Sequence, residues 1–319
     1  MVMSKVMVTS MAETLTRRGF LRSAVGCGAA MSLLPGCVGV AEQKSKAKKW
    51  KMKLATSSVM FDRLPIEQVC ERVERLGLGG LDIWAPFTYD GAQCKHLEEI
   101  KNRLGGNGLR ELMGKHKLEM AAFTIYGNNF SQYWEMIRDY GGGIVVRSDN
   151  AEASSPEDMT RNMRVFFENL KPEIELAEKS NSVLAIENHG GGLFNTIDSF
   201  RAFVELNPNA RRVGIAFAPW HLQAFKAPIE DVIKIAGPQI RFFYAWQRAD
   251  GSGQLPGFGP ADFTPWLQAL ADARYSHYVS IFLHGHGPAD EMESNVCKSR
   301  NYLLDRYGYL VERELDKRI

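Results

Sequence analysis

Short apolar segments alternate with amphipathic helical patterns along the chain from residue 50 onward. Most apolar segments end at Gly, Pro, Asn or His, as buried strands bounded by turns do. The first helical pattern places Ile66, Val69, Val73 and Leu76 on one face. The predicted strands are 51–58, 80–86, 118–127, 143–149, 183–192, 212–221, 240–247 and 278–287. The predicted helices are 65–77, 98–116, 131–141, 155–180, 196–207, 228–237, 263–275 and 291–318.

Eight strand-then-helix units favour an α/β fold, a single (β/α)8 TIM barrel, for which ~250 residues is typical. The last helical pattern, 291–318, predicts a C-terminal helical extension. A doubly wound open sheet is the alternative, and it requires a glycine-rich turn after its first strand. The segment that follows the first strand, SSVMFDRLP (57–65), has no such turn. We therefore predict the barrel.

The first fifty residues follow a different pattern. Arg17 and Arg18 precede a short apolar run, 24–34, too short for the ~20 residues that span a bilayer. This order is typical of a secretory signal. The segment RRGFLR closely resembles a twin-arginine export signal, and LLPGC resembles a lipoprotein signal-peptidase site that lipidates Cys37. An N-terminal amphipathic helix packed on the domain is the alternative.

Three regions follow from this reading: an export signal over 1–37, a lysine-rich polar tether over 38–50, and the barrel domain over 51–319. The protein is expected to be exported by the twin-arginine route. It would then be a periplasmic protein or, if Cys37 is lipidated, a membrane-anchored lipoprotein.

The overall composition is that of an ordinary globular protein. The 319 residues are 45% hydrophobic and 24% charged, with a formal net charge of +2. This balance gives no reason to expect nucleic acid or an anionic membrane surface as a partner, so the lipid at Cys37 is the only membrane contact expected. Without the signal, Cys70, Cys94 and Cys297 remain; they allow one disulfide at most and form no zinc-type cluster.

Polar and aromatic residues collect where the predicted strands end. In a barrel of this type the chemistry lies in the loops after the strands. Four of the seven histidines fall at three of these ends. Glu187 is the strongest candidate, because a carboxylate at a barrel mouth is costly to bury unpaired. The residues at these ends are Asp82, Trp84, Glu187, Asn188, His189, Trp220, His221, Tyr244, Trp246, Gln247, His284 and His286.

Five segments carry a resemblance to a known family. They are GLDIWAP (80–86), AIENHGG (185–191), APWHLQ (218–223), LPGFGPADF (255–263) and YVSIFLHG (278–285). Through them the chain from residue 50 to about 304 resembles the xylose isomerase-like TIM barrels, a superfamily of sugar isomerases, epimerases and endonuclease IV. The segment PGFGPADF, followed by a helix, is especially similar to the loop after the seventh strand in that family.

The resemblance implies a divalent metal held by residues at the ends of strands five to eight, and a histidine that binds substrate. Glu187 matches the first ligand and His221 matches the substrate histidine. The other three ligand positions are Ala218, Tyr244 and Phe282 and have lost the family's residues. One surviving carboxylate does not hold Mg²⁺ or Mn²⁺, which require several donors.

Two explanations for the lost ligands stay open. In one, a single divalent metal (Mn²⁺, Zn²⁺ or Mg²⁺) is bound by a new set, Glu187, His221 and His284. Three donors with open positions would suit Zn²⁺ or Mn²⁺. In the other, the site works without a metal.

The resemblance and the predicted export together imply an exported sugar-active enzyme of the isomerase or epimerase type, or a lyase, acting on a free sugar, polyol or keto-sugar. Glu187 would be base or ligand, His221 would polarise or orient a hydroxyl, and His189 and His284 would be additional acid–base groups. The expected substrate-binding residues are Trp84, His189, Trp220, Trp246 and Gln247. The alternative function is a non-catalytic carbohydrate-binding barrel. An endonuclease role is not expected, because the chain has no basic DNA face or multi-metal ligand set.

Overall fold

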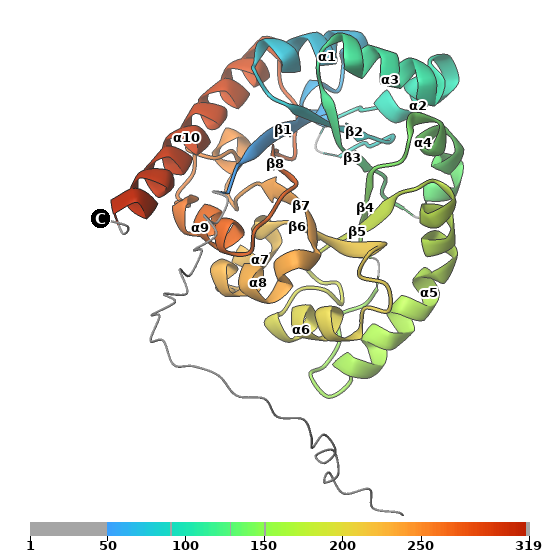
Figure 1. Cartoon of the computed structure of the whole chain (residues 1–319), viewed down its shortest axis with the longest axis vertical. Helices are drawn as coiled ribbons and strands as arrows, with labels where there is room; N and C mark the ends of the chain where they lie inside the picture. The colour runs from blue at the N-terminus through green and yellow to red at the C-terminus, as the bar shows by residue number, and fades with distance from the viewer. Residues whose placement is uncertain (1–49, 90, 128, 150, 317–319) are drawn as a thin grey trace, which may run out of the picture. The chain divides into compact units, whose positions relative to one another are not determined.

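The computed structural model describes residues 50–89, 91–127, 129–149 and 151–316, with side chains as far as Val311. In this part of the chain eight parallel strands form a closed barrel in the order β1 to β8, and helices cover its outer face (Figure 1). The predicted (β/α)8 barrel is confirmed. The strands are β1 (Lys53–Ser57), β2 (Gly80–Trp84), β3 (Glu119–Thr124), β4 (Ile144–Ser148), β5 (Val183–Glu187), β6 (Val213–Phe217), β7 (Ile240–Ala245) and β8 (Tyr278–Ile281). The helices are α1 (Ile66–Arg75), α2 (His96–Arg103), α3 (Gly105–Lys115), α4 (Trp134–Tyr140), α5 (Met159–Lys179), α6 (Ile197–Leu206), α7 (Pro219–Gln223), α8 (Ile229–Ala236), α9 (Thr264–Asp272) and α10 (Ala289–Asp316).

The strands are buried on both faces, which explains why they read as nearly continuous apolar runs. Side chains alternate between the barrel interior and the surrounding helices. On β5, Leu184 and Ile186 pack in the outer core, whereas Ala185 belongs to the interior cluster of alanines and aromatic residues. Glu187 follows Ala185 by two positions and so faces the interior as well. The strand alternation therefore aims this carboxylate at the barrel axis.

The helical pattern predicted over 98–116 forms two helices. They are interrupted at Leu104, and Gly105 has a φ of +64°, a conformation that glycine adopts without steric cost. The predicted C-terminal extension is present as α10, which begins two residues before the predicted start of 291.

Two predicted helix starts have different outcomes. Thr196, where the helix 196–207 was predicted to begin, caps α6, because its hydroxyl accepts a hydrogen bond of 3.1 Å from the Ser199 N–H. The Ser155 hydroxyl likewise accepts from the Asp158 N–H at 3.3 Å. That contact closes a turn ahead of the helix, however, and α5 begins only at Met159.

The export signal predicted over 1–37 and the tether as far as residue 49 lie outside the described residues. The description begins at Trp50, whose ring meets that of Tyr307 edge to face and whose carbonyl accepts a hydrogen bond of 2.8 Å from the Tyr307 hydroxyl. Trp50 therefore packs on the barrel domain. No helix in the described part of the chain is both long and apolar enough to cross a membrane. The thiols described there are free: Cys70, Cys94 and Cys297.

Candidate active site at the carboxyl end of the barrel

A cavity of about 540 Å³ opens where the loops after the strands meet. Its size lies within the ~300–1,000 Å³ range of small-molecule sites. Glu187, His221 and His284 all line it, although they come from the ends of three different strands. The expectation that these three side chains share one barrel mouth agrees with the structure. Other lining residues are Phe87, Tyr89, Tyr126, Ser148, His189, Trp220, Phe225, Trp246, Arg248, Asp250 and Gln254.

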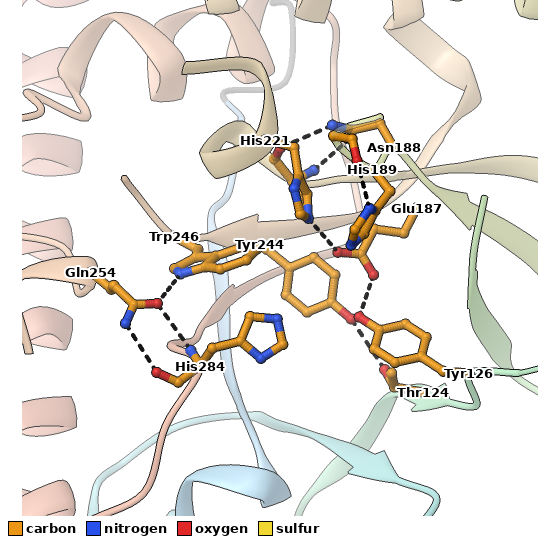
Figure 2. Close-up of polar contacts among 12 residues, drawn as sticks. Thr124, Tyr126, Glu187, Asn188, His189, His221, Tyr244, Trp246, Gln254 and His284 are labelled. Atoms are coloured by element: carbon orange, nitrogen blue, oxygen red, sulfur yellow. Dashed lines mark hydrogen bonds and ion pairs between the residues drawn. The ribbon is translucent and has the colours of Figure 1, made fainter. Parts of the chain in front are cut away.

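Glu187 lies at the floor of the cavity and is 1% exposed. Its two carboxylate oxygens have different surroundings. Oε2 accepts a hydrogen bond from the Tyr126 hydroxyl, whereas Oε1 lies 3.7 Å from Nε2 of His221 (Figure 2). One oxygen is thus held by a tyrosine that also lines the cavity, and the other faces the histidine.

His221 lies on the short helix α7, whereas the sequence placed it at the end of the predicted strand 212–221, because β6 ends at Phe217. Pro219 stands in the first turn of that helix, where its missing N–H costs nothing. The Asn188 side chain fixes the start of the helix, because its amide donates to the Ala218 carbonyl at 3.0 Å and accepts from the Ala218 N–H at 2.8 Å. Asn188 therefore ties the end of β5 to the end of β6 and sets the position of His221 opposite Glu187.

The imidazole of His221 is only 4% exposed. Burial lowers its pKa below the ordinary value of 6.5, and the neighbouring Glu187 carboxylate opposes that change only in part. His221 is accordingly neutral at neutral pH. Its buried Nε2 makes no hydrogen bond within the described part of the chain, so a ligand hydroxyl or carbonyl can pair with it. The His189 ring packs against it with centroids 4.2 Å apart.

Aromatic rings that contact His221 form one wall of the cavity. Trp246 and Trp220 stack with centroids 5.0 Å apart and an interplanar angle of 11°. The Arg248 guanidinium, which follows β7, lies 4.8 Å from the centre of the Trp220 ring on α7. Such a wall suits the apolar face of a sugar ring.

His284 lies across the cavity from Glu187, among the rings of Trp246, Phe87 and Tyr89. Its backbone is held by Gln254, whose side chain accepts from the His284 N–H at 3.1 Å and donates to the His284 carbonyl at 3.0 Å (Figure 2). The same Gln254 oxygen accepts from the Trp246 indole at 2.7 Å.

Two residues expected to bind substrate do not line the cavity. The Trp84 ring is fully buried, stacks on Phe282 with centroids 5.2 Å apart, and donates its indole N–H to Asp82 at 2.6 Å. The Gln247 side chain is also fully buried and bridges its own loop, donating to the Leu255 carbonyl at 2.8 Å. Both follow a strand end, but their side chains support the site and do not form its surface. Trp220, Trp246 and His189 do line the cavity.

The positions at which the family holds its metal do not fit a divalent ion. Ala218 and Phe282 offer no donor atom, and both are fully buried. The Tyr244 hydroxyl is within 3.2 Å of the Thr124 hydroxyl and does not reach the cavity lining. Burial, together with the charges of nearby carboxylates, raises the pKa of Tyr244 well above its ordinary value, so it is not a phenolate ligand.

The replacement ligand set expected from the sequence is not assembled either. In residues 50–316 as described, no three His, Cys, Asp or Glu side chains are placed to hold one metal together. Glu187 and His221 are close, but His284 is packed into the aromatic side of the cavity. The three side chains line one cavity, as expected. Binding one metal ion would require their donor atoms to lie close together as well, and they do not.

We expect protein purified without chelators to carry no stoichiometric Mn²⁺, Zn²⁺ or Mg²⁺, because the available donors are too few and too far apart. Mass spectrometry of the elements in the purified protein measures this. A matched triple variant, Ala218→Asp, Tyr244→His and Phe282→Glu, supplies donors at the family positions and serves as the positive control. One equivalent of metal in the natural protein, lost on His221→Ala, would contradict the expectation.

Three further residues of the site were not singled out from the sequence: Tyr126, Thr124 and Gln254. Tyr126 follows the end of β3 by two positions, so the rule that strand ends carry the site could have found it. Thr124 is the last residue of β3, and nothing distinguishes it from a core threonine. Gln254 lies in the middle of a loop, and no local pattern indicates its contact with His284.

Comparison with known proteins agrees with this architecture. The family model described as xylose isomerase-like TIM barrel matches residues 70–300. No match was found among the curated proteins. Many solved structures are similar, at identities that show the fold alone.

Three of these structures illustrate the likeness. A structure of the IolI protein with a binding zinc atom is 18% identical, with a TM-score of 0.61 over 80% of this chain and 98% of that chain. The 3-keto-D-glucoside 4-epimerase YcjR from E. coli is 17% identical, with a TM-score of 0.58 over 79% of this chain and 100% of that chain. D-psicose 3-epimerase in the presence of D-fructose is 14% identical, with a TM-score of 0.60 over 79% of this chain and 98% of that chain.

Proposed function

The chain belongs to the xylose isomerase-like TIM barrel family, and from this premise we propose that it is a carbohydrate-active enzyme that moves a proton next to a carbonyl group. Isomerisation and epimerisation of a free sugar or keto-sugar are reactions of this kind. The observation that carries the proposal is the pair at the cavity floor, Glu187 Oε1 and His221 Nε2, 3.7 Å apart. The solved epimerases named above act on sugars, which supports the substrate class.

In the proposed reaction Glu187 is the general base. Its Oε1 takes the proton from the carbon next to the substrate carbonyl, and the C–H electron pair moves to form an enediolate. His221, neutral and buried, donates a hydrogen bond from Nε2 to the oxygen that gains charge. In isomerisation Glu187 then returns the proton to the carbon that held the carbonyl, and the hydroxyl proton of the first carbon passes to the oxygen that gained charge. In epimerisation water protonates the opposite face of the same carbon, and Glu187 releases its proton to solvent. In both cases the protons gained and lost are equal, so no co-reactant is consumed.

Proton exchange with solvent tests this proposal directly. The protein is incubated in D₂O with a panel of free ketoses, aldoses and keto-sugars, and NMR follows deuterium at the carbon beside each carbonyl. Incorporation with at least one sugar is expected, because a base that shares its proton with water labels the substrate. Failure with every member of the panel, by protein that still binds sugar, would exclude the proposal.

A second candidate, a carbohydrate-binding barrel without catalysis, is favoured by one observation. Ala218 and Phe282 leave the family's metal positions without donors. The stacked Trp220 and Trp246 would bind a sugar ring in either case. Calorimetry that detects saturable sugar binding, with no deuterium incorporated into the same sugar, would favour this candidate.

We further propose export by the twin-arginine route, for which the support is the arginine pair ahead of a short apolar run. Changing Arg17 and Arg18 to lysine should leave the precursor in the cytoplasm, because the twin-arginine export machinery recognises the two arginine side chains and not their positive charge alone. Fractionation and immunoblotting measure the effect, with Arg22→Lys as the matched control. Equal periplasmic amounts of the double variant and the control would overturn the proposal.

If Cys37 is lipidated, Cys37→Ala moves the exported protein from the membrane fraction to the soluble one.

A further inference from the structure

Two large aromatic side chains are exposed at the entrance of the cavity. Tyr89 is 60% exposed and Phe225 is 55% exposed, and both line the same cavity as Glu187 and His221. The two floor residues, by contrast, are 1% and 4% exposed. Single exposed apolar side chains are common on proteins and require no explanation. A pair of exposed rings on one small-molecule cavity does, because aromatic rings are typical ligand contacts in such cavities.

The two rings belong to opposite sides of the barrel mouth. Tyr89 follows β2, and Phe225 follows α7, which comes directly after β6. In the closed strand order, β3, β4 and β5 separate β2 from β6 in one direction, and β7, β8 and β1 separate them in the other. The loops after these two strands therefore face each other across the mouth. A ligand that extends from the floor to the mouth passes between Tyr89 and Phe225.

The loop that carries Tyr89 is held by its own contacts. Phe87 and Cys94 pair in an isolated antiparallel bridge, with two backbone hydrogen bonds of 3.0 Å each. The Tyr89 ring meets the His284 ring edge to face, with centroids 5.3 Å apart. These contacts keep the Tyr89 ring at the entrance although most of its surface is exposed.

Phe225 lies close to the floor of the cavity. A Cβ atom added to Gly190 would lie 3.8 Å from Cε2 of Phe225 and 3.6 Å from Nδ1 of His221. The Phe225 ring and the His221 imidazole therefore border the same space beside Gly190. Because residue 190 has no side chain to divide that space, one ligand can contact both the floor and the Phe225 ring.

Two charged side chains of opposite sign line the cavity from the loop after β7. Arg248 and Asp250 are both exposed. Within the described part of the chain, neither side chain has a hydrogen bond or an ion pair with another residue, although the Arg248 guanidinium lies over the Trp220 ring. Charged donors and acceptors form stronger hydrogen bonds than neutral ones. Since their charges are opposite, the two groups suit a neutral ring with many hydroxyls better than an anion.

The cavity is larger than one sugar requires. Its volume of about 540 Å³ lies in the range of sites that hold drug-sized ligands, and a single hexose is smaller than such a ligand. One ring at the floor contacts Glu187, His221 and Trp246, which leaves the mouth for a second ring.

We propose that the substrate is a two-ring carbohydrate. Its reacting ring lies at the floor beside Glu187 and His221, and a glycosidic bond joins that ring to a second one at the mouth. We define the outer subsite, which holds the second ring, by four residues: Tyr89, Phe225, Arg248 and Asp250. The aromatic rings contact the apolar face of the second ring, and the charged groups bind its hydroxyls. The glycosidic bond stays intact. This inference rests on the proposed function of the floor residues.

Sugars that differ by one ring test the outer subsite without any turnover. Isomaltulose, maltulose and lactulose carry a second hexose on D-fructose, and maltose and cellobiose carry one on D-glucose. By calorimetry, at least one disaccharide should have a dissociation constant roughly 10-fold below that of its monosaccharide, the effect of one stacked ring. If no disaccharide of this panel binds more tightly than its monosaccharide, the proposal is wrong.

Variants of the two exposed rings locate the second sugar. Phe225→Ala and Tyr89→Ala should each reduce the ratio of the two dissociation constants toward one, because a stacking surface is lost. Phe225→Tyr, which keeps a ring, should retain the ratio. Phe258→Ala is the matched control, since Phe258 is also exposed but does not line the cavity. A purely structural role would change the affinity for both sugars alike, so an unchanged ratio in either alanine variant would overturn this placement.

Proton exchange in D₂O separates this inference from the proposed function. Exchange into the preferred disaccharide should show a lower KM than exchange into its monosaccharide, with a similar kcat, because the second ring binds equally well before and during the reaction. Preference for a disaccharide without exchange would support the outer subsite and count against Glu187 as the base. Exchange with equal kcat/KM for both members of every pair would support the base and overturn the outer subsite.

Discussion

Replacing Glu187 by glutamine is expected to lower the rate of proton exchange into substrate by about 10²- to 10⁴-fold, the range that one general base contributes. Glutamine has the same size, and its oxygen can still accept from Tyr126, so the fold should be affected little. The amide cannot take a proton from carbon at neutral pH. NMR of deuterium incorporation measures the rate, and denaturant unfolding measures stability, which should change by less than about 1 kcal/mol.

Glu157→Gln is the matched control, because Glu157 is an exposed carboxylate in the turn before α5, away from the cavity. It should leave both measurements unchanged. If Glu187→Gln kept the full rate of exchange, another group would have to be the base. A large loss of stability with a proportional loss of rate would show that Glu187 is structural.

Phe282→Ala is expected to destabilise the folded state by about 3–5 kcal/mol, as truncation of a buried phenylalanine does. The Phe282 ring is fully buried and contacts the rings of Trp84, Tyr244 and Trp246, with centroid distances of 5.2, 5.0 and 5.1 Å. Phe282, Trp84 and Tyr244 lie beneath the cavity and support Trp246, which lines it. Removing one leaves a void that strands of a closed barrel cannot move together to fill. Chemical or thermal unfolding measures the loss.

Phe258→Ala provides the comparison, because its ring is 37% exposed on the loop before α9. It should cost less than about 1 kcal/mol. A small effect of Phe282→Ala, similar to that of the control, would mean that the aromatic support is loosely packed. The space would then be open to a ligand, and the argument against a metal at this position would lose its basis.

The fold was predictable because its signals are local. Strand and helix periodicities repeat within a few residues, so eight apolar runs with eight helical patterns indicate a barrel without knowledge of any contact. The same alternation aims Glu187 inward, since Ala185 two positions earlier belongs to the interior. Helix boundaries were harder to place where two polar residues can each precede the first turn, as Ser155 and Asp158 do before α5.

The candidate site was predictable only in part. Glu187 and His221 were found because a position at the end of a strand indicates at which end of the barrel a residue lies. That position does not indicate how deeply the side chain is buried or which residues it contacts. Trp84 and Gln247 were therefore taken for cavity residues, although they lie beneath it or within a loop. The position of His284 relative to Glu187 depends on contacts with residues distant in the sequence, such as Gln254 and Phe87, and could not be inferred.

The sequence by itself determined the strand order, the inward direction of Glu187 and the loss of donors at Ala218 and Phe282. Only the closed barrel decided which polar groups meet inside it. The hydrogen bond from Thr124 to Asp82 joins residues 42 positions apart, and the contact of Thr124 with Tyr244 joins residues 120 apart. The physical reason is that periodicity is a property of neighbours along the chain. A hydrogen bond between distant strands depends on register and closure, which no single segment encodes.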